Sequence, residues 1–325
     1  MVDVDGGRAF FARTDPQLLR AASFLDGRVP FATSEPAPTE LAPLLLNKVE
    51  RNDPDRLIFN CSFCGSTYLA RLVDVPGSSL VLKEPRALVD LAAWTSLNIA
   101  DGLPIDRLDD ALTFALAAIR RRFATGEVVT IKVGNQANVL IHSIAKTPRH
   151  VRPVFNTIGR LDFLRAIFRG GAGRMRHAAQ IAWHMAKVIS GGEDLLAEAQ
   201  GSSIDPLQQA ANLALVDLHL QLTIFREAAS KGGWDERHFV DYSDIIAAPR
   251  DAAQKTTAAL DLPIDMGDIE RNLDQLASRN AKIPSEAFSA IRQDAIHNQL
   301  HAEYGKFFDQ ALDWADKTLG SEFVS

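Results

Sequence analysis

Between residues 57 and 158 the chain alternates short apolar runs with segments of helical periodicity. The apolar runs are LIFN (57–60), LVLK (80–83), VVTIKV (128–133) and VRPVFNTI (151–158). Helical patterns occupy 67–74, 86–99, 106–124, 137–147 and 160–169. Continuous apolar strands that alternate with helices are typical of a parallel sheet covered on both faces. The sequence therefore predicts an α/β fold of the P-loop type, in which ligands bind at the carboxyl ends of the strands.

The remainder of the chain is mostly helical in pattern. Asp15 and Pro16 are typical of an N-cap followed by proline at the first helical position, and TELAPLLLNKVER (39–51) predicts a second helix. HFVDYSDII (238–246) predicts one more strand running into a turn. We therefore expect a helical lead-in at 1–55, an α/β domain at 56–265 with a helical insertion at 174–232, and C-terminal helices at 266–325 packed on the same domain.

Composition narrows the class of protein. The 325 residues are 46% hydrophobic and 23% charged, which is enough for a large core. The 35 basic and 41 acidic residues give a net charge of −6, so the basic excess typical of nucleic-acid binding is missing. The N-terminus, MVDVDGGRAFFARTD, lacks a signal-peptide core, and no apolar run approaches the ~18 residues of a membrane span. We expect a cytoplasmic protein whose two cysteines are thiols and whose partner is a small molecule, not a nucleic acid or a membrane.

The stretch CSFCGST (61–67) follows the first predicted strand and carries the strongest chemical signal. A loop with Gly65, Ser66 and Thr67 before a helix directs backbone N–H groups and two hydroxyls at one spot, at the positive end of the helix dipole. The glycine lets the backbone approach a ligand closely. The GxxxxGK[ST] pattern for metal-bound nucleoside triphosphates is absent. The loop therefore predicts a cradle for a single terminal phosphate or sulfate.

Other interpretations of this stretch remain open. Cys61 and Cys64 form a CxxC at the start of a helix, an arrangement that lowers a thiol pKa in redox proteins. The chain lacks the small thioredoxin-like context for that function, and a metal site would need further ligands. The simplest alternative is a strand-to-helix turn capped by Ser66 or Thr67.

The sequence FNCSFCGSTYLARLV (59–73) resembles the 5′-phosphate loop of the P-loop sulfotransferase superfamily. A variant group of uncharacterised bacterial sulfotransferase-like proteins carries cysteines in this loop and a Lys/Ser-Glu-Pro signature on the next strand, which VLKEP (81–85) resembles. Weaker similarities are TIKVGNQANVL (130–140), GRLDFLRAIFRGG (159–171) and VDYSDIIAAP (240–249). The resemblance covers roughly residues 57–262.

The resemblance implies a nucleotide-binding transferase that uses 3′-phosphoadenosine 5′-phosphosulfate (PAPS) as co-substrate, without a metal. The loop residues implied to bind it are Cys64, Gly65, Ser66, Thr67 and Tyr68. Phe63 stands where the family typically has a basic residue, and the usual Arg and Ser for the 3′-phosphate would fall near Ile158 and Ala166. Nearby arginines are candidates to substitute, and of these we assign Arg160 and Arg165 to the cofactor.

Three charged residues at predicted strand ends are the catalytic candidates: Lys83, Glu84 and Lys132. A charge is costly to bury in mid-sheet, so a place beside the ligand crevice is expected. Lys83 or Lys132 would replace the missing basic residue, and Glu84 would accept a proton from the acceptor. A surface ion pair, or a lysine that snorkels from a strand end, is the alternative.

We expect the arginine-rich stretch 160–176 to form a solvated helix face from which one or two arginines bind an anion. His177 and His184 are interpreted as packing or surface residues.

The leading hypothesis is a sulfotransferase-like enzyme that moves a sulfuryl group to a hydroxyl or amine, with positioning and charge stabilisation supplying the rate. A kinase-like phosphotransferase that needs Mg²⁺ is one alternative. A non-catalytic nucleotide-binding or scaffold protein of the same fold is the other, and Phe63 favours it.

Overall fold

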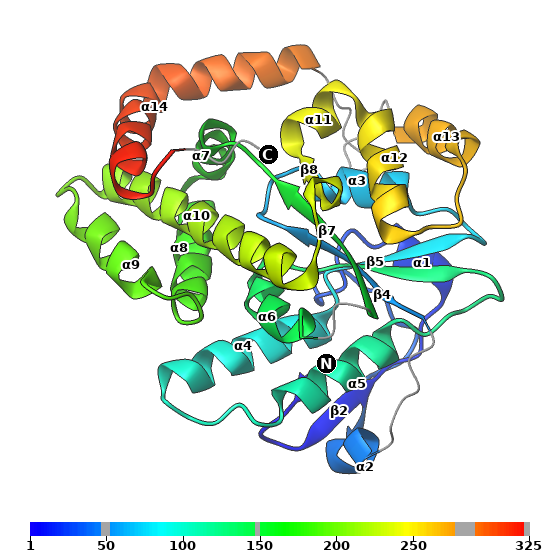
Figure 1. Ribbon diagram of the computed structural model, residues 1–325. Helices are drawn as coiled ribbons and strands as arrows, with labels where there is room; N and C mark the ends of the chain where they lie inside the picture. The colour runs from blue at the N-terminus through cyan, green and yellow to red at the C-terminus, as the bar shows by residue number, and fades with distance from the viewer. Residues whose placement is uncertain (47–52, 147–149, 277–289, 322–325) are drawn as a thin grey trace.

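A five-stranded parallel sheet lies at the centre of the computed structural model, which describes residues 1–46, 53–146, 150–276 and 290–321 (Figure 1). The order across the sheet is β5-β6-β4-β7-β8, and every neighbouring pair is parallel. The strands are β4 (Asp55–Asn60), β5 (Ser79–Lys83), β6 (Val128–Lys132), β7 (Val151–Thr157) and β8 (Phe239–Asp241). The predicted α/β class and the five predicted strands are confirmed.

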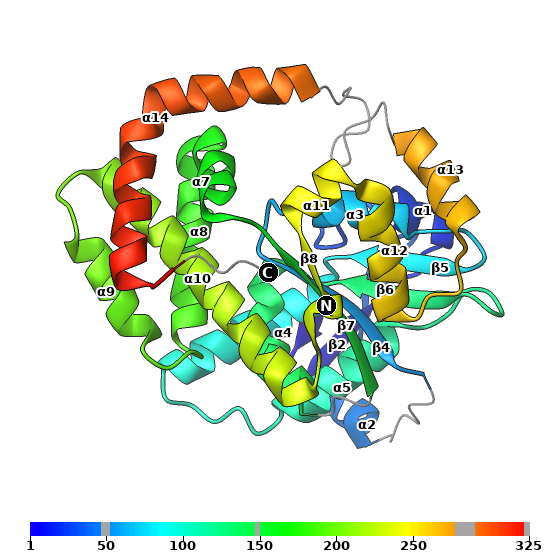
Figure 2. The ribbon, with the colours of Figure 1, turned by 45° about the horizontal axis from the view of Figure 1, so that its top comes forward.

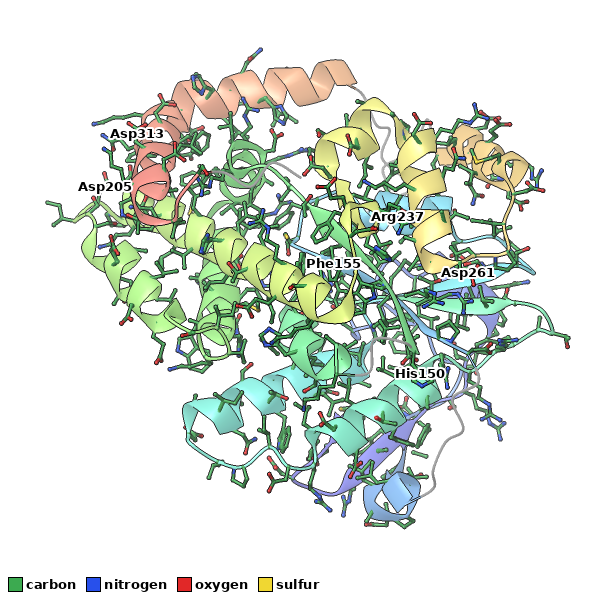
Figure 3. All side chains as sticks on the ribbon, in the orientation of Figure 1. His150, Phe155, Asp205, Arg237, Asp261 and Asp313 are labelled. Carbon is green, nitrogen blue, oxygen red and sulfur yellow. The ribbon has the colours of Figure 1, made fainter. Side chains whose placement is uncertain are left out.

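Helices cover both faces of this sheet (Figures 1 and 2). On one face Phe59 and Phe155 stack with ring centres 5.5 Å apart, and Phe225 and Phe239 pack against Phe155 (Figure 3). On the other face Ile58, Val81, Val154 and Val240 form a second core. Every residue of β4 and β5 is buried, and the middle of each strand is an apolar run without alternation, LIF in β4 and LVL in β5.

The helices of the first face are α4 (Arg86–Ala100), α5 (Leu108–Ile119), a 3₁₀ turn η1 (Asn135–Leu140), α6 (Ile141–Ile144), α7 (Arg160–Arg169), α8 (Gly171–Ala186), α9 (Gly192–Gly201) and α10 (Pro206–Gly232). The second face carries α3 (Ser66–Leu72), α11 (Tyr242–Ala247), α12 (Pro249–Leu260) and α13 (Met266–Leu276), and η3 (Glu236–His238) precedes β8. The expected helix at 137–147 is thus 3₁₀ in its first part, and its last residue lies outside the described ranges. None of the described helices is long and apolar enough to cross a membrane.

The lead-in differs from the expected helical segment. It contains a small antiparallel sheet of β1 (Val2–Asp3), β2 (Arg8–Phe11) and β3 (Ala37–Glu40), together with α1 (Pro16–Ala21) and α2 (Leu41–Leu46). The pairing of β2 with β3 joins residues about thirty positions apart, which local periodicity does not reveal. The predicted cap is confirmed, because the Asp15 carboxylate accepts a hydrogen bond from the Leu18 N–H. The predicted helix 39–51 is shorter in the structure: residues 39–40 belong to β3, α2 covers Leu41–Leu46, and residues 47–51 lie outside the described ranges.

The C-terminal part is helical, as predicted. The long α14 (Ala290–Thr318) packs against α7 and α10, with the Phe308 ring 5.1 Å from that of Phe168 (Figure 2). The other C-terminal helix, α13, packs on α12 and α3.

Candidate functional site

The loop between β4 and α3 lies at the carboxyl edge of the sheet and is tightly turned. Ser62, Phe63 and Gly65 all have positive φ, at 67°, 55° and 74°. For the two non-glycine residues this conformation costs about 1–2 kcal/mol each. Such backbone is held only where surrounding contacts determine it, and it concentrates at functional sites.

A buried polar network holds the start of this loop. The Asn60 side chain donates to the Val133 carbonyl (2.6 Å) and accepts from the Ser62 N–H (3.2 Å). Asn138 donates to the Asn60 carbonyl at 3.0 Å and to Gln221 on α10 at 2.8 Å. The network thus ties the central strand to the neighbouring strand and to the long helix, which fixes the loop in place.

Gly65 packs closely against α11, a helix on the second face of the sheet. A Cβ on this residue would lie 3.2 Å from the Ile245 side chain and 3.4 Å from the Tyr242 ring, both on α11. With its positive φ, the position suits only glycine without strain. The Gly65 carbonyl then accepts the Tyr68 and Leu69 N–H groups and starts α3.

Both cysteines are free and fully buried in this loop. Burial raises the pKa of Cys61 well above its usual value and also raises that of Cys64. A redox or metal-binding cysteine needs an accessible thiolate, so the geometry argues against the redox interpretation. Hydrogen bonding by Ser66 and by the Cys61 backbone lowers the pKa of Cys64, against the larger effect of burial.

Lys132 is the cation on the strand side of the loop. Its positive charge lowers the pKa of the Cys64 thiol, against the effect of burial. Its ammonium group donates to the Glu84 carboxylate, with Nζ and Oε1 2.5 Å apart. The Lys132 side chain is 2% exposed and that of Glu84 16%. The structure therefore brings together two of the predicted catalytic residues at the ends of adjacent strands.

Glu84 is held in an unusual backbone conformation. Its φ is +56°, and its N–H donates to the Lys132 carbonyl at 2.7 Å. The other carboxylate oxygen accepts from Arg28 at 3.2 Å, so the lead-in contributes a side chain here. His177 on α8 lies within electrostatic reach of this group: burial lowers its pKa, Glu84 raises it and Arg28 lowers it. A histidine with a lowered pKa is neutral at physiological pH and can accept a proton.

Arg174 is the cation on the helix side of the loop. Its guanidinium group lies over the Phe63 ring, 4.5 Å from the ring centre, which is a cation–π contact. It also donates to the Ala166 carbonyl at 2.6 Å, and its hydrocarbon stem lies against Gly170. Burial lowers its pKa, as does the nearby charge of Arg169. A positive charge thus stands beside Phe63, from a residue 111 positions later in the sequence.

Lys83 is directed to other partners. Its ammonium group is fully buried, donates to the Arg20 carbonyl at 3.1 Å and lies 3.6 Å from the Asp74 carboxylate. Burial lowers its pKa to about 8, despite the opposing effect of Asp74. Arg20 also pairs with Asp74 and Glu127, so Lys83 belongs to a buried ionic cluster that ties α1 to the sheet edge.

Arg160 and Arg165 have intramolecular partners too. Arg160 is buried and donates to Asp316 at 2.6 Å and to the Gly320 carbonyl at 2.7 Å, which fastens α7 to the end of α14. Arg165 pairs with Asp162 on its own helix at 3.0 Å. Arg169, exposed at the end of α7, is the arginine whose charge acts on Arg174 and Tyr242.

The remaining predicted loop residues lie around the start of α3. Ser66 and Thr67 are buried, each with 4% exposure, and Tyr68 is partly buried against the second core. Burial raises the pKa of Tyr68, which stays a protonated phenol at neutral pH.

Sequence reasoning missed Arg28 and His177 and left Arg174 as one member of an arginine-rich stretch. Each comes from an element outside the strand–loop–helix unit, so the spacing within that unit carries no signal for them. The crossing of α8 over η1 and α4 brings these helical residues to the strand ends.

The site is thus a strand–loop–helix turn with strained backbone at the carboxyl edge of a parallel sheet, and Lys132 and Arg174 bring positive charge to Cys64 and Phe63 of its loop. The fold defines an α/β protein with a parallel sheet flanked by helices. Comparison of the chain with models of protein families finds no match, and comparison with curated proteins finds no significant relative.

Proposed function

We propose that the chain is a sulfotransferase-like enzyme that binds PAPS through the 61–67 loop and transfers its sulfuryl group to a hydroxyl or amine of a small molecule. The observation that carries this proposal is that two cations act on a loop that resembles the 5′-phosphate loop: the charge of Lys132 acts on Cys64, and Arg174 lies over the Phe63 ring. Phe63 stands where the resemblance implies a basic side chain, and in this proposal these two cations replace it.

The residues fit the anionic end of such a co-substrate. Ser66, at the start of α3, offers a backbone N–H and a hydroxyl group, and hydrogen bonding by both lowers the pKa of the neighbouring Cys64 thiol. Sulfur is a weak acceptor, and a phosphate or sulfate oxygen makes a stronger, charge-assisted bond to the same donors. Lys132 and Arg174 would then balance the added negative charge.

In this proposal the acceptor oxygen or nitrogen attacks sulfur, and the bond between sulfur and the bridging phosphate oxygen breaks. Charge develops on that bridging oxygen, and Lys132 is the candidate to stabilise it. The acceptor loses a proton to Glu84, which pairs with Lys132, or to His177, whose pKa is raised by the charge of Glu84. Adenosine 3′,5′-bisphosphate leaves as the second product.

The 3′-phosphate would need a cation close to the loop. Arg169 is exposed at the end of α7, and its charge acts on Arg174, which lies over Phe63, so we assign it the 3′-phosphate in place of Arg160 and Arg165.

The test is calorimetric titration of the reduced protein with adenosine 3′,5′-bisphosphate and, in parallel, with ATP and Mg²⁺. The proposal expects micromolar binding of the bisphosphate without metal and weaker binding of ATP·Mg²⁺. Preference for ATP·Mg²⁺ would replace it with the kinase-like alternative. Binding of neither nucleotide would remove the enzyme proposal and leave a non-catalytic protein with this fold.

A further inference from the structure

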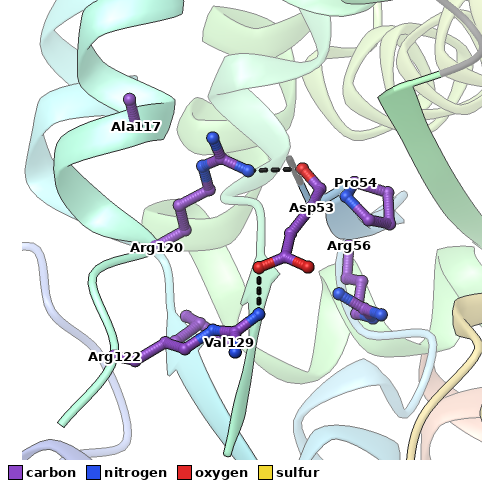
Figure 4. A pocket seen from close by; sticks show the side chains of 7 residues that line it. All are labelled: Asp53, Pro54, Arg56, Ala117, Arg120, Arg122 and Val129. Carbon is purple, nitrogen blue, oxygen red and sulfur yellow. Dashed lines mark hydrogen bonds and ion pairs between the residues drawn. The ribbon is translucent and has the colours of Figure 1, made fainter. Parts of the chain in front are cut away.

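A second charged site lies at the opposite, amino-terminal edge of the sheet. Figure 4 shows a cavity of about 250 Å³ between the start of β4, the start of β6 and the end of α5. Its charged lining consists of Arg56, Arg120, Arg122 and Asp53, and the rest of its wall is apolar. Arg56 and Asn60 are four residues apart in β4, so roughly 13 Å of strand separates this cavity from the loop.

Arg56 places a positive charge in a desolvated position. Its side chain is 8% exposed and donates to the carbonyl groups of Leu260 (2.9 Å) and Asp261 (3.3 Å and 3.2 Å). The Asp261 carboxylate is 4.0 Å away and 77% exposed. Carbonyl groups satisfy the donors but do not neutralise the charge. Burial lowers the pKa of Arg56, the charges of Asp261 and Asp53 raise it, and the smaller effects of Arg122 and Arg152 lower it.

Arg120 and Arg122 converge on the same space from the other side (Figure 4). Arg120 donates to the Asp53 carbonyl and lies 3.7 Å from the buried Asp55 carboxylate. Arg122 pairs with the Asp53 side chain, which is 48% exposed. Three guanidinium groups thus line one space, and each has a carboxylate nearby: Asp55 is buried beside Arg120, whereas the Asp53 and Asp261 side chains are exposed. An anion that enters the cavity would compete with the two exposed carboxylates for the arginines.

We propose that this cavity binds a small oxyanion of the phosphate class, held by Arg56, Arg120 and Arg122. Guanidinium groups pair with phosphate oxygens in a bidentate geometry, and three of them surround one space here. A volume of about 250 Å³ holds such an ion with several waters, since a water occupies about 30 Å³. Asp53 competes with the anion for Arg122, so ligand binding would release this ion pair.

Inorganic phosphate is the probe, titrated calorimetrically into the full chain at constant ionic strength. Arg122→Gln removes one charge-assisted contact and should weaken binding about tenfold or more. Arg121→Gln is the matched control, because it removes the same charge from an exposed neighbour that does not line the cavity. Asp53→Asn should tighten binding, because it frees Arg122.

Phosphate could instead bind at the 61–67 loop, so Arg174→Gln is titrated as well. The proposal expects this variant to keep phosphate binding at the amino-terminal edge. Loss of binding in Arg174→Gln with full binding in Arg122→Gln would overturn it. Equal effects of Arg121→Gln and Arg122→Gln, or no heat at millimolar phosphate, would overturn it too. An organic phosphate monoester, glycerol 3-phosphate, titrated alongside distinguishes free phosphate from an esterified source.

Discussion

The guanidinium group of Arg174 stacks on the ring of Phe63, with 4.5 Å between the guanidinium carbon and the ring centre. Phe63 occupies the loop position at which the sulfotransferase resemblance has a basic side chain. The contact therefore returns a positive charge to that position from another helix. It also gives Phe63 a role of its own, because the ring holds the arginine in place.

The first prediction concerns this arginine. Arg174→Gln should weaken binding of adenosine 3′,5′-bisphosphate about tenfold, because it removes one charge-assisted contact to the anion. Isothermal calorimetry measures the change. Arg176→Gln is the control, since Arg176 lies two residues away on α8 and is exposed. A similar loss in both variants would show a general charge effect and would contradict the local role of Arg174.

The second prediction tests the packing that positions Arg174. A Cβ at Gly170 would lie 2.0 Å from the Arg174 Cδ, so Gly170→Ala should force that side chain out of its place. We expect the same loss of nucleotide affinity as in Arg174→Gln, and no further loss in the double variant. Gly173→Ala is the matched control, because its Cβ would meet no described atom within 4 Å. If Gly170→Ala binds the nucleotide normally, the position of Arg174 is unimportant for the site.

The third prediction concerns the Lys132–Glu84 ion pair, whose atoms are 2.5 Å apart. Lys132→Gln should weaken nucleotide binding at least tenfold, whereas Glu84→Gln should strengthen it several-fold, because the lysine charge is then no longer neutralised. The two substitutions change the net charge in opposite directions, and titration calorimetry measures the nucleotide affinity of both variants.

The exposed pair Lys146–Asp109 is the control for net charge, with side chains 60% and 56% exposed. Lys146→Gln and Asp109→Asn should leave the affinity unchanged. Weaker binding in Glu84→Gln would mean that the carboxylate holds the loop in shape, and it would remove Lys132 as a contact for the ligand.

Much of this fold could be predicted from the sequence, because its central strands are buried on both sides. Strands β4 and β5 are buried throughout, and the middle of each is an apolar run without alternation, LIF in β4 and LVL in β5, which stands out from the helices around it. The pairing of β2 with β3 could not be predicted, because it depends on contacts between distant residues. β3 is an edge strand of this small sheet and contains Pro38. Proline lacks the N–H that a central strand needs, so it is tolerated at an edge.

The site was less predictable than the sheet. Lys83 and Lys132 are register partners on adjacent strands and look equivalent in sequence. The structure gives them different partners. Lys83, on the edge strand β5, contacts the Asp74 carboxylate and the Arg20 carbonyl of α1, whereas Lys132 pairs with Glu84. Arg174 approaches the loop only because α7 and α8 turn at Gly170. Such placement depends on the tertiary arrangement of helices, for which local periodicity has no signal.

The last prediction concerns Asp217 on α10, a buried carboxyl group at the end of the polar network. It accepts a hydrogen bond from Gln221 at 2.8 Å, and Gln221 in turn accepts from Asn138. Burial raises the pKa of Asp217 well above its usual value, against the smaller effect of the Gln221 hydrogen bond. Between the unfolded and folded pKa values the folded state binds more protons. The free energy of unfolding should therefore fall as pH rises through this range.

Asp217→Asn keeps the acceptor for Gln221 and removes the titrating group. The variant should be more stable than the natural chain at pH 8, and the difference should shrink toward pH 5, because the unfolded carboxyl group is then closer to being protonated. Urea unfolding at the two pH values measures this difference. Asp313→Asn, on the surface of α14, should show no such trend, since its side chain is exposed. A stability loss in Asp217→Asn that grows with pH would show that Asp217 is ionised in the fold and stabilised there by its neighbours.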